Sequence, residues 1–354
     1  MRWAGQKIDD DAPALLPMKG LVRSVRTPEF EGVTFHEVAA KTALNKVPAQ
    51  SNMPFTWTIN PMRGCLHQCR YCFARKTHEY LDLDSGRDFD TQIVVKTNVA
   101  EVLGAELAKP SWRREHVALG TNTDPYQRAE GRYRLMPGII RALAESGTPF
   151  SILTKGPLLK RDLPLLKEAA QQVPVSVAVS LAIMDAELQQ RVEPGTPDPR
   201  ARLNLIKAIT DAGLECNVLA MPILPWLTDS AEQLDALHGA LAEAGAGWVT
   251  TGALHLRPGA REWFMQWLQA EYPALVPQYR RLYRGARGGF TSYASAEYKK
   301  WLGKQAAAAR RRHGFVVRED RVWRGRSAPD ETPAARPQLN DLEVSAGPAQ
   351  SALF

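Results

Sequence analysis

Three cysteines stand close together in one short stretch of the chain, NPMRGCLHQCRYCF, and are the residues best suited to chemistry. They are Cys65, Cys69 and Cys72. Three thiolates on one tight loop can bind three irons of a [4Fe–4S] cluster, and the fourth iron then stays open to a substrate or cofactor. A closed zinc site is the alternative, with His67 or His78 as the fourth ligand. The spacing of the cysteines alone leaves both kinds of metal site open.

A framework has to hold these cysteines, and strand-like and helix-like segments alternate along most of the chain. Strands are predicted at residues 55–60, 116–121, 149–155, 174–181, 216–224 and 248–254. Helices are predicted at residues 98–108, 138–147, 158–172, 200–213 and 230–245. The predicted strands are apolar nearly throughout, which is typical of parallel strands that are buried on both faces. About six βα units therefore predict an α/β fold, a partial (βα)6 TIM-like barrel, with an open doubly wound sheet as the alternative.

Polar side chains stand where these apolar strands end. The second predicted strand runs into Thr121, Thr123 and Asp124, and the third ends at Lys155. In both candidate folds, functional groups lie at the C-terminal ends of the strands. Thr121 and Asp124 can equally be structural, because threonine and aspartate often cap the helix that follows. A lysine at a buried strand end needs a charged partner, and for Lys155 we expect a ligand carboxylate.

The chain divides into four expected segments. Residues 1–50 show no sustained periodicity and are interpreted as an irregular N-terminal arm. The barrel core follows at residues 51–260, and a basic helical segment at residues 261–326. Residues 327–354 are rich in Ala, Pro and Ser, which is typical of a disordered tail.

The net charge of +7 on the 354 residues is concentrated near the C-terminus. Residues 278–326 hold 14 basic and three acidic side chains. The aromatic residues among them are Tyr279, Tyr283, Phe290, Tyr293, Tyr298, Trp301 and Trp323. Positive charge next to aromatic faces suits phosphate contacts and base stacking, so this segment is a candidate nucleic-acid interface. Alternatively, Tyr298, Trp301 and Leu302 form one stripe of a helix at residues 296–314 that docks on the barrel.

Composition excludes several classes of protein. With only four cysteines, the chain is not a disulfide-stabilised scaffold. Cys216, outside the cluster, begins a predicted strand, and we expect a buried apolar thiol there. The longest nearly apolar run, residues 173–184, is too short to span a membrane. The N-terminus shows no secretory signal, so we expect a cytoplasmic protein without membrane association.

The Cys-x3-Cys-x2-Cys spacing, with Tyr71 before the last cysteine and the first barrel strand before the loop, resembles the radical S-adenosylmethionine (SAM) superfamily. The resemblance implies that Cys65, Cys69 and Cys72 hold a [4Fe–4S] cluster and that SAM occupies its fourth iron. It also implies that Tyr71 lies near the adenine. Reductive cleavage of SAM would give a 5′-deoxyadenosyl radical that abstracts hydrogen from the substrate. The implied partner is an external one-electron reductant of the flavodoxin or ferredoxin type.

Within this superfamily, roughly residues 52–260 look most like the spore photoproduct lyase-like group, the DNA repair photolyase type. By position in the motifs, Thr123 would contact SAM, Lys155 would approach its carboxylate, and Ser180 would lie near the ribose. The run RVEPG also resembles the group, and its Arg191 would help to hold the cofactor or orient the fourth helix. The alternative for Arg191 is an exposed side chain in a loop.

One departure from the group concerns the substrate. Lyases of this group carry a cysteine that donates a hydrogen atom after the second strand, and Thr121 stands at that position here. A hydroxyl is a poorer hydrogen-atom donor than a thiol, so the resemblance does not extend to the lyase reaction. We therefore expect a radical SAM enzyme whose substrate is unidentified, with nucleic acid as the first candidate, and we assign no catalytic residue. The alternatives are a non-catalytic nucleic-acid-binding protein with structural zinc, and a radical SAM enzyme that acts on a peptide.

Overall fold

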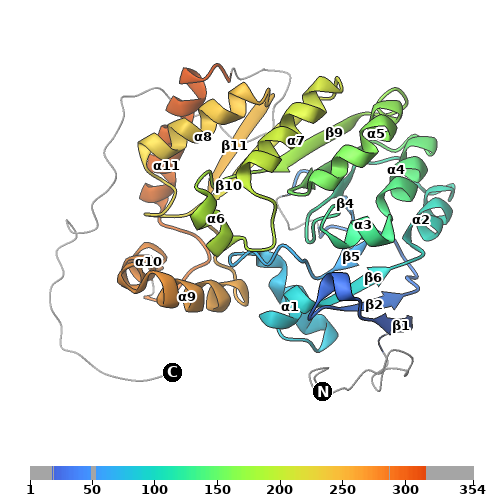
Figure 1. The fold of residues 1–354 in the computed structure, drawn as a ribbon, viewed down its shortest axis with the longest axis horizontal. Helices are drawn as coiled ribbons and strands as arrows, with labels where there is room; N and C mark the ends of the chain where they lie inside the picture. The colour runs from blue at the N-terminus through green and yellow to red at the C-terminus, as the bar shows by residue number, and fades with distance from the viewer. Residues whose placement is uncertain (1–17, 19, 49–52, 287, 316–354) are drawn as a thin grey trace.

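A parallel sheet forms the centre of the protein (Figure 1). The computed structural model describes residues 18, 20–48, 53–286 and 288–315. The six parallel strands are β4 (Trp57–Ile59), β7 (Val117–Leu119), β8 (Phe150–Thr154), β9 (Val175–Ser180), β10 (Cys216–Ile223) and β11 (Trp248–Ala253). Each strand pairs with the next one in this series, and the short antiparallel strand β3 (Leu44–Lys46) completes the sheet beside β4. The predicted partial (βα)6 barrel is confirmed.

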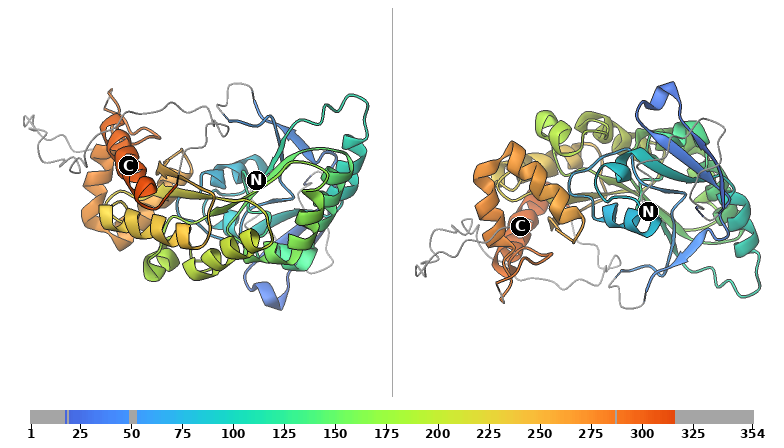
Figure 2. Two further views of the ribbon diagram at one scale, coloured as in Figure 1. Left: turned by 90° about the horizontal axis from the view of Figure 1, so that it is seen from above. Right: turned by 90° about the horizontal axis from the view of Figure 1, so that it is seen from below.

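Helices cover one face of this sheet in the order in which the chain builds them. They are α2 (Val99–Leu107), α4 (Met136–Glu145), α5 (Leu163–Ala169), α7 (Pro199–Asp211) and α8 (Ala231–Glu243). In Figure 2 the green and yellow helices form one layer along one side of the sheet. Alternate strand residues such as Val218 and Ala220 are fully buried, whereas the intervening Leu219 is only half-buried. The strands are therefore more deeply buried on one face than on the other.

The helix ends follow local sequence signals. Asp198 accepts a hydrogen bond from the backbone of α7, and Ser230 forms a capping box with Gln233 at the start of α8. Gly147 and Gly213 follow α4 and α7 with φ angles of +71° and +83°. Only glycine adopts this left-handed conformation without strain, which is why these helices end there.

The N-terminal segment differs from the prediction. In the described part of residues 1–50, β1 (Leu21–Val25) and β2 (Thr34–Val38) form a second sheet with β6 (Gln92–Lys96) and β5 (Met62–Arg63). The expectation of an irregular arm is wrong for these residues. Every residue of β2 is buried, polar ones included, and His36 bonds to Ser24 and Gln92, so the strand lacks an alternating apolar pattern. Because β5 leads directly into the cysteine loop, this sheet fixes where the loop begins.

The C-terminal part of the described chain is mainly helical, with α9 (Ala260–Glu271), α10 (Val276–Leu282) and α11 (Ala296–Arg312). On α11 the stripe of Tyr298, Trp301 and Leu302 is buried, and the Tyr298 hydroxyl lies 2.9 Å from an oxygen of Asp229. The docking alternative for this helix is therefore confirmed. The predicted tail, residues 327–354, lies outside the described residues. Among the described helices, none has the length and apolarity that crossing a membrane requires.

Candidate functional site

The cysteine loop runs from β5 to a 3-10 helix, η3 (Phe73–Leu81), between the two sheets. Cys65 and Cys69 are buried, Cys72 is half-buried, and all three are free thiols. Burial raises the pKa of each thiol, that of Cys69 to about 12. Thiols in such surroundings ionise when a metal takes the place of the proton. Three free thiols on one loop supply the number of cysteine donors that a [4Fe–4S] cluster with one open iron requires.

Two side chains outside the cysteine motif hold the loop in shape. Gln127 is fully buried, and its side-chain amide accepts from Leu66 N at 2.9 Å and donates to Gly64 O at 3.2 Å. Arg75, also fully buried, donates two hydrogen bonds to Cys69 O and forms an ion pair of 2.9 Å with Asp90. Neither residue stands out in the sequence, because a glutamine in a loop and an arginine in a helix ordinarily face solvent.

A segment distant in sequence closes over the loop. Residues 192–196, named here the clasp, begin at the last residue of helix α6 (Ala186–Val192). Arg70 N donates to Val192 O at 2.9 Å, and Gly195 N donates to His67 O at 3.1 Å. A Cβ atom on Gly195 would lie 1.9 Å from Leu66 O, so only glycine permits this approach. The clasp therefore packs backbone against backbone on the cysteine loop.

Asp124 joins the cysteine loop to two strand ends. Its carboxylate lies 2.9 Å from His67 Nε2 and accepts hydrogen bonds of 2.6 Å from both the Thr154 hydroxyl and Lys155 N. Burial on its own would raise the pKa of Asp124, but His67 and these hydrogen bonds lower it below its ordinary value. The other ring nitrogen of His67 faces Gly195 O at 3.3 Å. Both ring nitrogens thus face acceptor oxygens, which removes His67 from the zinc-ligand alternative.

The second candidate zinc ligand is also turned to another partner. His78 lies on η3, and its Nε2 is 2.9 Å from Gln92 O on β6. Its ring stacks edge-to-face on Phe89. His78 is thus held through Nε2, whereas its buried Nδ1 has no hydrogen-bond partner in the described part of the chain. The contacts argue against His67 as a zinc ligand and leave His78 as the remaining histidine for that alternative.

Lys155 has its charged partner within the protein. Its Nζ lies 2.5 Å from Glu193 Oε1 and 2.7 Å from the Tyr71 hydroxyl, which also donates to Glu193. Arg202 Nη2 contacts the other oxygen of Glu193 at 2.8 Å, and both side chains are fully buried. Burial opposes ionisation of Glu193, but Lys155 and Arg202 bring its pKa well below its ordinary range. Glu193 therefore supplies the charged partner that a lysine at this strand end needs, and a ligand carboxylate beside Lys155 stays a prediction.

Thr123 and Ser180, two further residues predicted to contact SAM, both lie close to the strand ends. Thr123 is buried and donates to Met62 O at 3.0 Å. Ser180 is buried at the end of β9, and its carbonyl accepts from Arg202 at 3.2 Å. Together with Tyr71 and Lys155, these residues surround the C-terminal ends of β7, β8 and β9 beside the cysteine loop.

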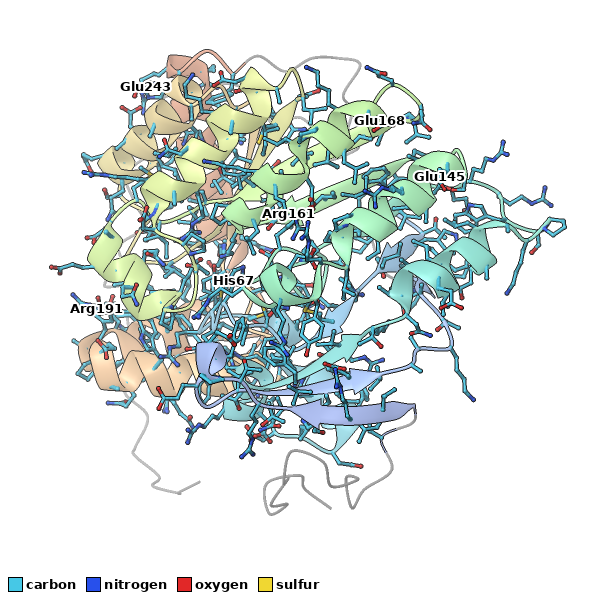
Figure 3. The ribbon with its side chains drawn as sticks, turned by 45° about the vertical axis from the view of Figure 1, so that its right-hand side comes forward. His67, Glu145, Arg161, Glu168, Arg191 and Glu243 are labelled. Atoms are coloured by element: carbon cyan, nitrogen blue, oxygen red, sulfur yellow. The ribbon has the colours of Figure 1, made fainter. Side chains whose placement is uncertain are left out.

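Arg191 lies apart from this group. Its side chain is 45% exposed and contacts Glu187 and the Tyr272 hydroxyl, both at 3.3 Å. Figure 3 shows His67 toward the middle of the molecule and Arg191 at its outer edge. The exposed alternative therefore describes Arg191 better than a cofactor contact does. The RVEPG run did indicate the right segment, but Glu193 is the residue of the run that reaches the site.

Two side-chain oxygens near the same strand ends are buried without a hydrogen-bond partner in the described part of the chain. They are Oδ1 of Asn60, after β4, and Oγ1 of Thr121, after β7. An unpaired buried acceptor carries a cost in free energy, and such groups are usually satisfied by a bound molecule or water.

Cys216 lies away from the cysteine loop. It is fully buried at the start of β10, as expected for an apolar thiol.

Comparison with known proteins identifies the family. The model of the radical SAM superfamily matches residues 59–237. An uncharacterized protein of Mycobacterium tuberculosis is 59% identical over 342 residues, which cover 95% of this chain and 97% of that protein. An uncharacterized protein of Acidianus two-tailed virus is 27% identical over 209 residues, 57% of this chain and 68% of that protein.

Solved structures share the fold. Spore photoproduct lyase in complex with dinucleoside spore photoproduct superimposes with a TM-score of 0.58, at 15% sequence identity, over 79% of each chain. A tyrosine-to-phenylalanine variant of that lyase gives a TM-score of 0.59, at 16% identity, over 79% of this chain and 80% of that one. The family match includes the cysteine loop, β7 to β10 and the clasp, which are the parts that build the site. The chain therefore belongs to the radical SAM superfamily, and it is a radical SAM enzyme with a spore photoproduct lyase-like fold.

Proposed function

We propose that Cys65, Cys69 and Cys72 bind a [4Fe–4S] cluster with one open iron, and that SAM binds there. The observation that supports this proposal is the set of three free thiols on one loop, beside a largely buried lysine and hydroxyl groups at the ends of β7 to β9. When bound, the cluster and SAM would supply the chemistry, which is reductive cleavage of SAM to a 5′-deoxyadenosyl radical that removes a hydrogen atom from the substrate. Because this chemistry consumes an electron, an external one-electron reductant of the flavodoxin or ferredoxin type is part of the proposal.

The protein's own residues would bind and orient SAM. Lys155 Nζ carries three N–H groups and uses two on Glu193 and Tyr71, so one remains for the carboxylate of SAM. Ser180 would lie near the ribose, Thr123 would contact SAM through its hydroxyl, and Tyr71 would lie near the adenine. Arg191 is left out of this set, because its side chain contacts Glu187 and Tyr272 instead.

Anaerobic reconstitution with iron and sulfide tests the proposal. We expect the absorption of a [4Fe–4S] cluster, and release of 5′-deoxyadenosine when dithionite and SAM are added. Cys69→Ala should lose both, whereas Cys216→Ala, a buried cysteine away from the loop, should keep both. Colourless protein with one zinc per chain, prepared without oxygen, would instead favour a structural zinc site. Cluster and cleavage unchanged in Cys69→Ala would refute the proposed ligand set.

The substrate that we propose is a single-stranded nucleic acid, bound by a strip of exposed aromatic and cationic side chains. The strip consists of Phe73, Arg257, His255, Tyr293 and Lys299. Phe73 directly follows Cys72 and is 45% exposed, and the Arg257 guanidinium lies 5.4 Å above its ring. His255 and Tyr293 stack edge-to-face at 4.3 Å, and Lys299 Nζ lies 5.6 Å from the Tyr293 ring.

These side chains lead from the cysteine loop to the start of α11. Between the exposed His255 and Arg257, Leu256 is fully buried, so both neighbours face solvent on one side. Cations beside aromatic faces bind phosphates and stack bases. Four aromatic residues of the predicted nucleic-acid interface are buried and cannot stack bases: Tyr279, Tyr283, Tyr298 and Trp301. Trp323 lies outside the described residues.

Binding of a fluorescent single-stranded oligonucleotide at low and moderate salt tests the strip. We expect Arg257→Glu with Lys299→Glu to weaken binding by about tenfold at low salt, because two phosphate contacts are lost. The matched control is Arg280→Glu with Arg311→Glu, which makes the same change of charge at exposed positions outside the strip. Equal losses in both double variants would contradict a specific strip. No binding by the unchanged protein at low salt would favour a peptide substrate.

A further inference from the structure

We infer that Glu193 is a positioning residue for SAM binding: it holds Lys155 and the cysteine loop in one arrangement. The inference rests on the proposed function. The observation that carries it is the double ion pair of a fully buried carboxylate, 2.5 Å from Lys155 Nζ and 2.8 Å from Arg202 Nη2. None of these three residues belongs to the cysteine motif.

The carboxylate is itself rigidly held. Arg202 donates to Ser180 O at 3.2 Å, which ties α7 to the end of β9. Thr196 donates to Glu193 at 3.2 Å and accepts from Gln189 at 2.7 Å. All of these side chains except Lys155 are buried, so Glu193 has one available position. A lysine side chain has four rotatable bonds, and its ammonium group is placed accurately only when its partners are fixed.

Glu193 also connects this lysine to the cysteine loop. The Tyr71 hydroxyl bonds both to Glu193 and to Lys155 Nζ, and Tyr71 stands between Cys69 and Cys72. On either side of Glu193, the clasp bonds to the loop through Val192 and Gly195. Moving Glu193 would therefore displace the lysine and the loop together. The remaining N–H of Lys155 would then no longer point toward the carboxylate of SAM.

A second role for Glu193 has to be separated from positioning. Two cations flank its carboxylate, Arg202, which is fully buried, and Lys155, which is 13% exposed, so Glu193 also neutralises charge. A buried cation without its partner is strongly destabilising. Neutralisation requires a negative charge near this place, whereas positioning requires the carboxylate at the end of a glutamate-length side chain. Variants that change one property without the other distinguish the two roles.

The test uses anaerobically reconstituted full-length protein and two readouts besides activity. They are the affinity for SAM in equilibrium dialysis and the change in the electron paramagnetic resonance spectrum of the reduced cluster on adding SAM. Glu193→Asp keeps the charge and shortens the side chain by one methylene group. We expect iron content close to that of the unchanged protein, about tenfold weaker SAM binding and a reduced spectral change, as is usual when a supporting residue is altered.

Two further variants complete the test. Glu193→Gln with Arg202→Met removes one charge of each sign, and we expect it to fold and still bind SAM about tenfold more weakly. Glu187→Gln is the matched control, an exposed glutamate on the helix before the clasp, and should bind SAM as the unchanged protein does.

SAM affinity within twofold of the unchanged protein in Glu193→Asp, or its recovery in the Glu193→Gln, Arg202→Met double variant, would overturn the positioning role. Either of these two results would leave charge neutralisation as the function of Glu193. If the unchanged protein, loaded with its cluster, binds no SAM, the proposed function fails and the inference fails with it. If only the Glu193 variants bind weakly, the proposed function stands and Glu193 supports it.

Discussion

His67 and Asp124 form a buried pair whose Nε2 and Oδ2 atoms are 2.9 Å apart, with side chains 4% and 8% exposed. The pair joins the cysteine loop to the segment after β7, and through Lys155 N it reaches the end of β8. The loop is thus braced from both sides, by Asp124 and by the clasp. Its stability should depend on residues that touch no cysteine.

Asp124→Asn removes the charge that His67, Thr154 and Lys155 N share. We expect the unfolding free energy of the metal-free protein to fall by about 1–3 kcal/mol, because an amide in place of the carboxylate leaves at least one of these buried donors without an acceptor. Urea denaturation followed by tryptophan fluorescence measures it. The double variant with His67→Gln should cost less than the sum of the two single variants. A cost below about 1 kcal/mol for Asp124→Asn would mean that the pair does not brace the loop.

Gly195→Ala should loosen the clasp. Its Cβ would lie 1.9 Å from Leu66 O, so the two backbones must separate. We expect a loss of stability of about 1–3 kcal/mol, typical of overpacking, and iron retention well below that of the unchanged protein after reconstitution. Gly303→Ala is the control: this helical glycine on α11 has open space where the added methyl group would stand, and the substitution should stabilise by about 0.5–1 kcal/mol. Full iron retention in Gly195→Ala would argue against a close clasp.

His78 should make the metal-free protein less stable in acid. Burial lowers the pKa of His78 to about 4, whereas a histidine in the unfolded chain titrates near its ordinary value of about 6.5. Between these values the unfolded chain binds the proton, so stability is complete above about pH 6.5 and falls by roughly 3 kcal/mol on the way to pH 4. His78→Gln keeps an N–H for Gln92 O but cannot titrate. Its unfolding free energy should therefore fall less steeply with decreasing pH, and equal slopes would contradict this assignment.

Tyr298→Phe should weaken the docking of α11. The hydroxyl donates to Asp229, which is 1% exposed, and its loss leaves that carboxylate one donor short. We expect a cost of about 1–3 kcal/mol in unfolding free energy and faster proteolysis within α11. Tyr293→Phe, at a tyrosine that is 49% exposed, should leave both unchanged. Similar behaviour of the two variants would show that the hydrogen bond contributes nothing to docking.

Much of the barrel could be predicted because its strands are apolar nearly throughout and its helices carry clear end signals. The same periodicity fails for β2, whose buried His36 and Glu37 interrupt any apolar pattern. The cysteines and Lys155 stood out by type and position. Glu193 and Arg202 did not, because a charged residue in a loop or helix ordinarily faces solvent, and only long-range contacts bury this pair. Arg191 and Glu193 stand only two residues apart at the end of α6, yet the side chain of Arg191 is 45% exposed and that of Glu193 is fully buried.

The clasp also constrains the order in which the protein matures. His67 and Gly195 bond to each other although they are 128 positions apart in the chain, and four of the six parallel strands lie before Gly195. During synthesis the cysteines leave the ribosome long before the segment that covers them. Contacts between such distant parts of a chain form late in folding. The cysteine loop therefore stays open on this side until most of the barrel has been made, which leaves a period in which iron and sulfide can be delivered to it.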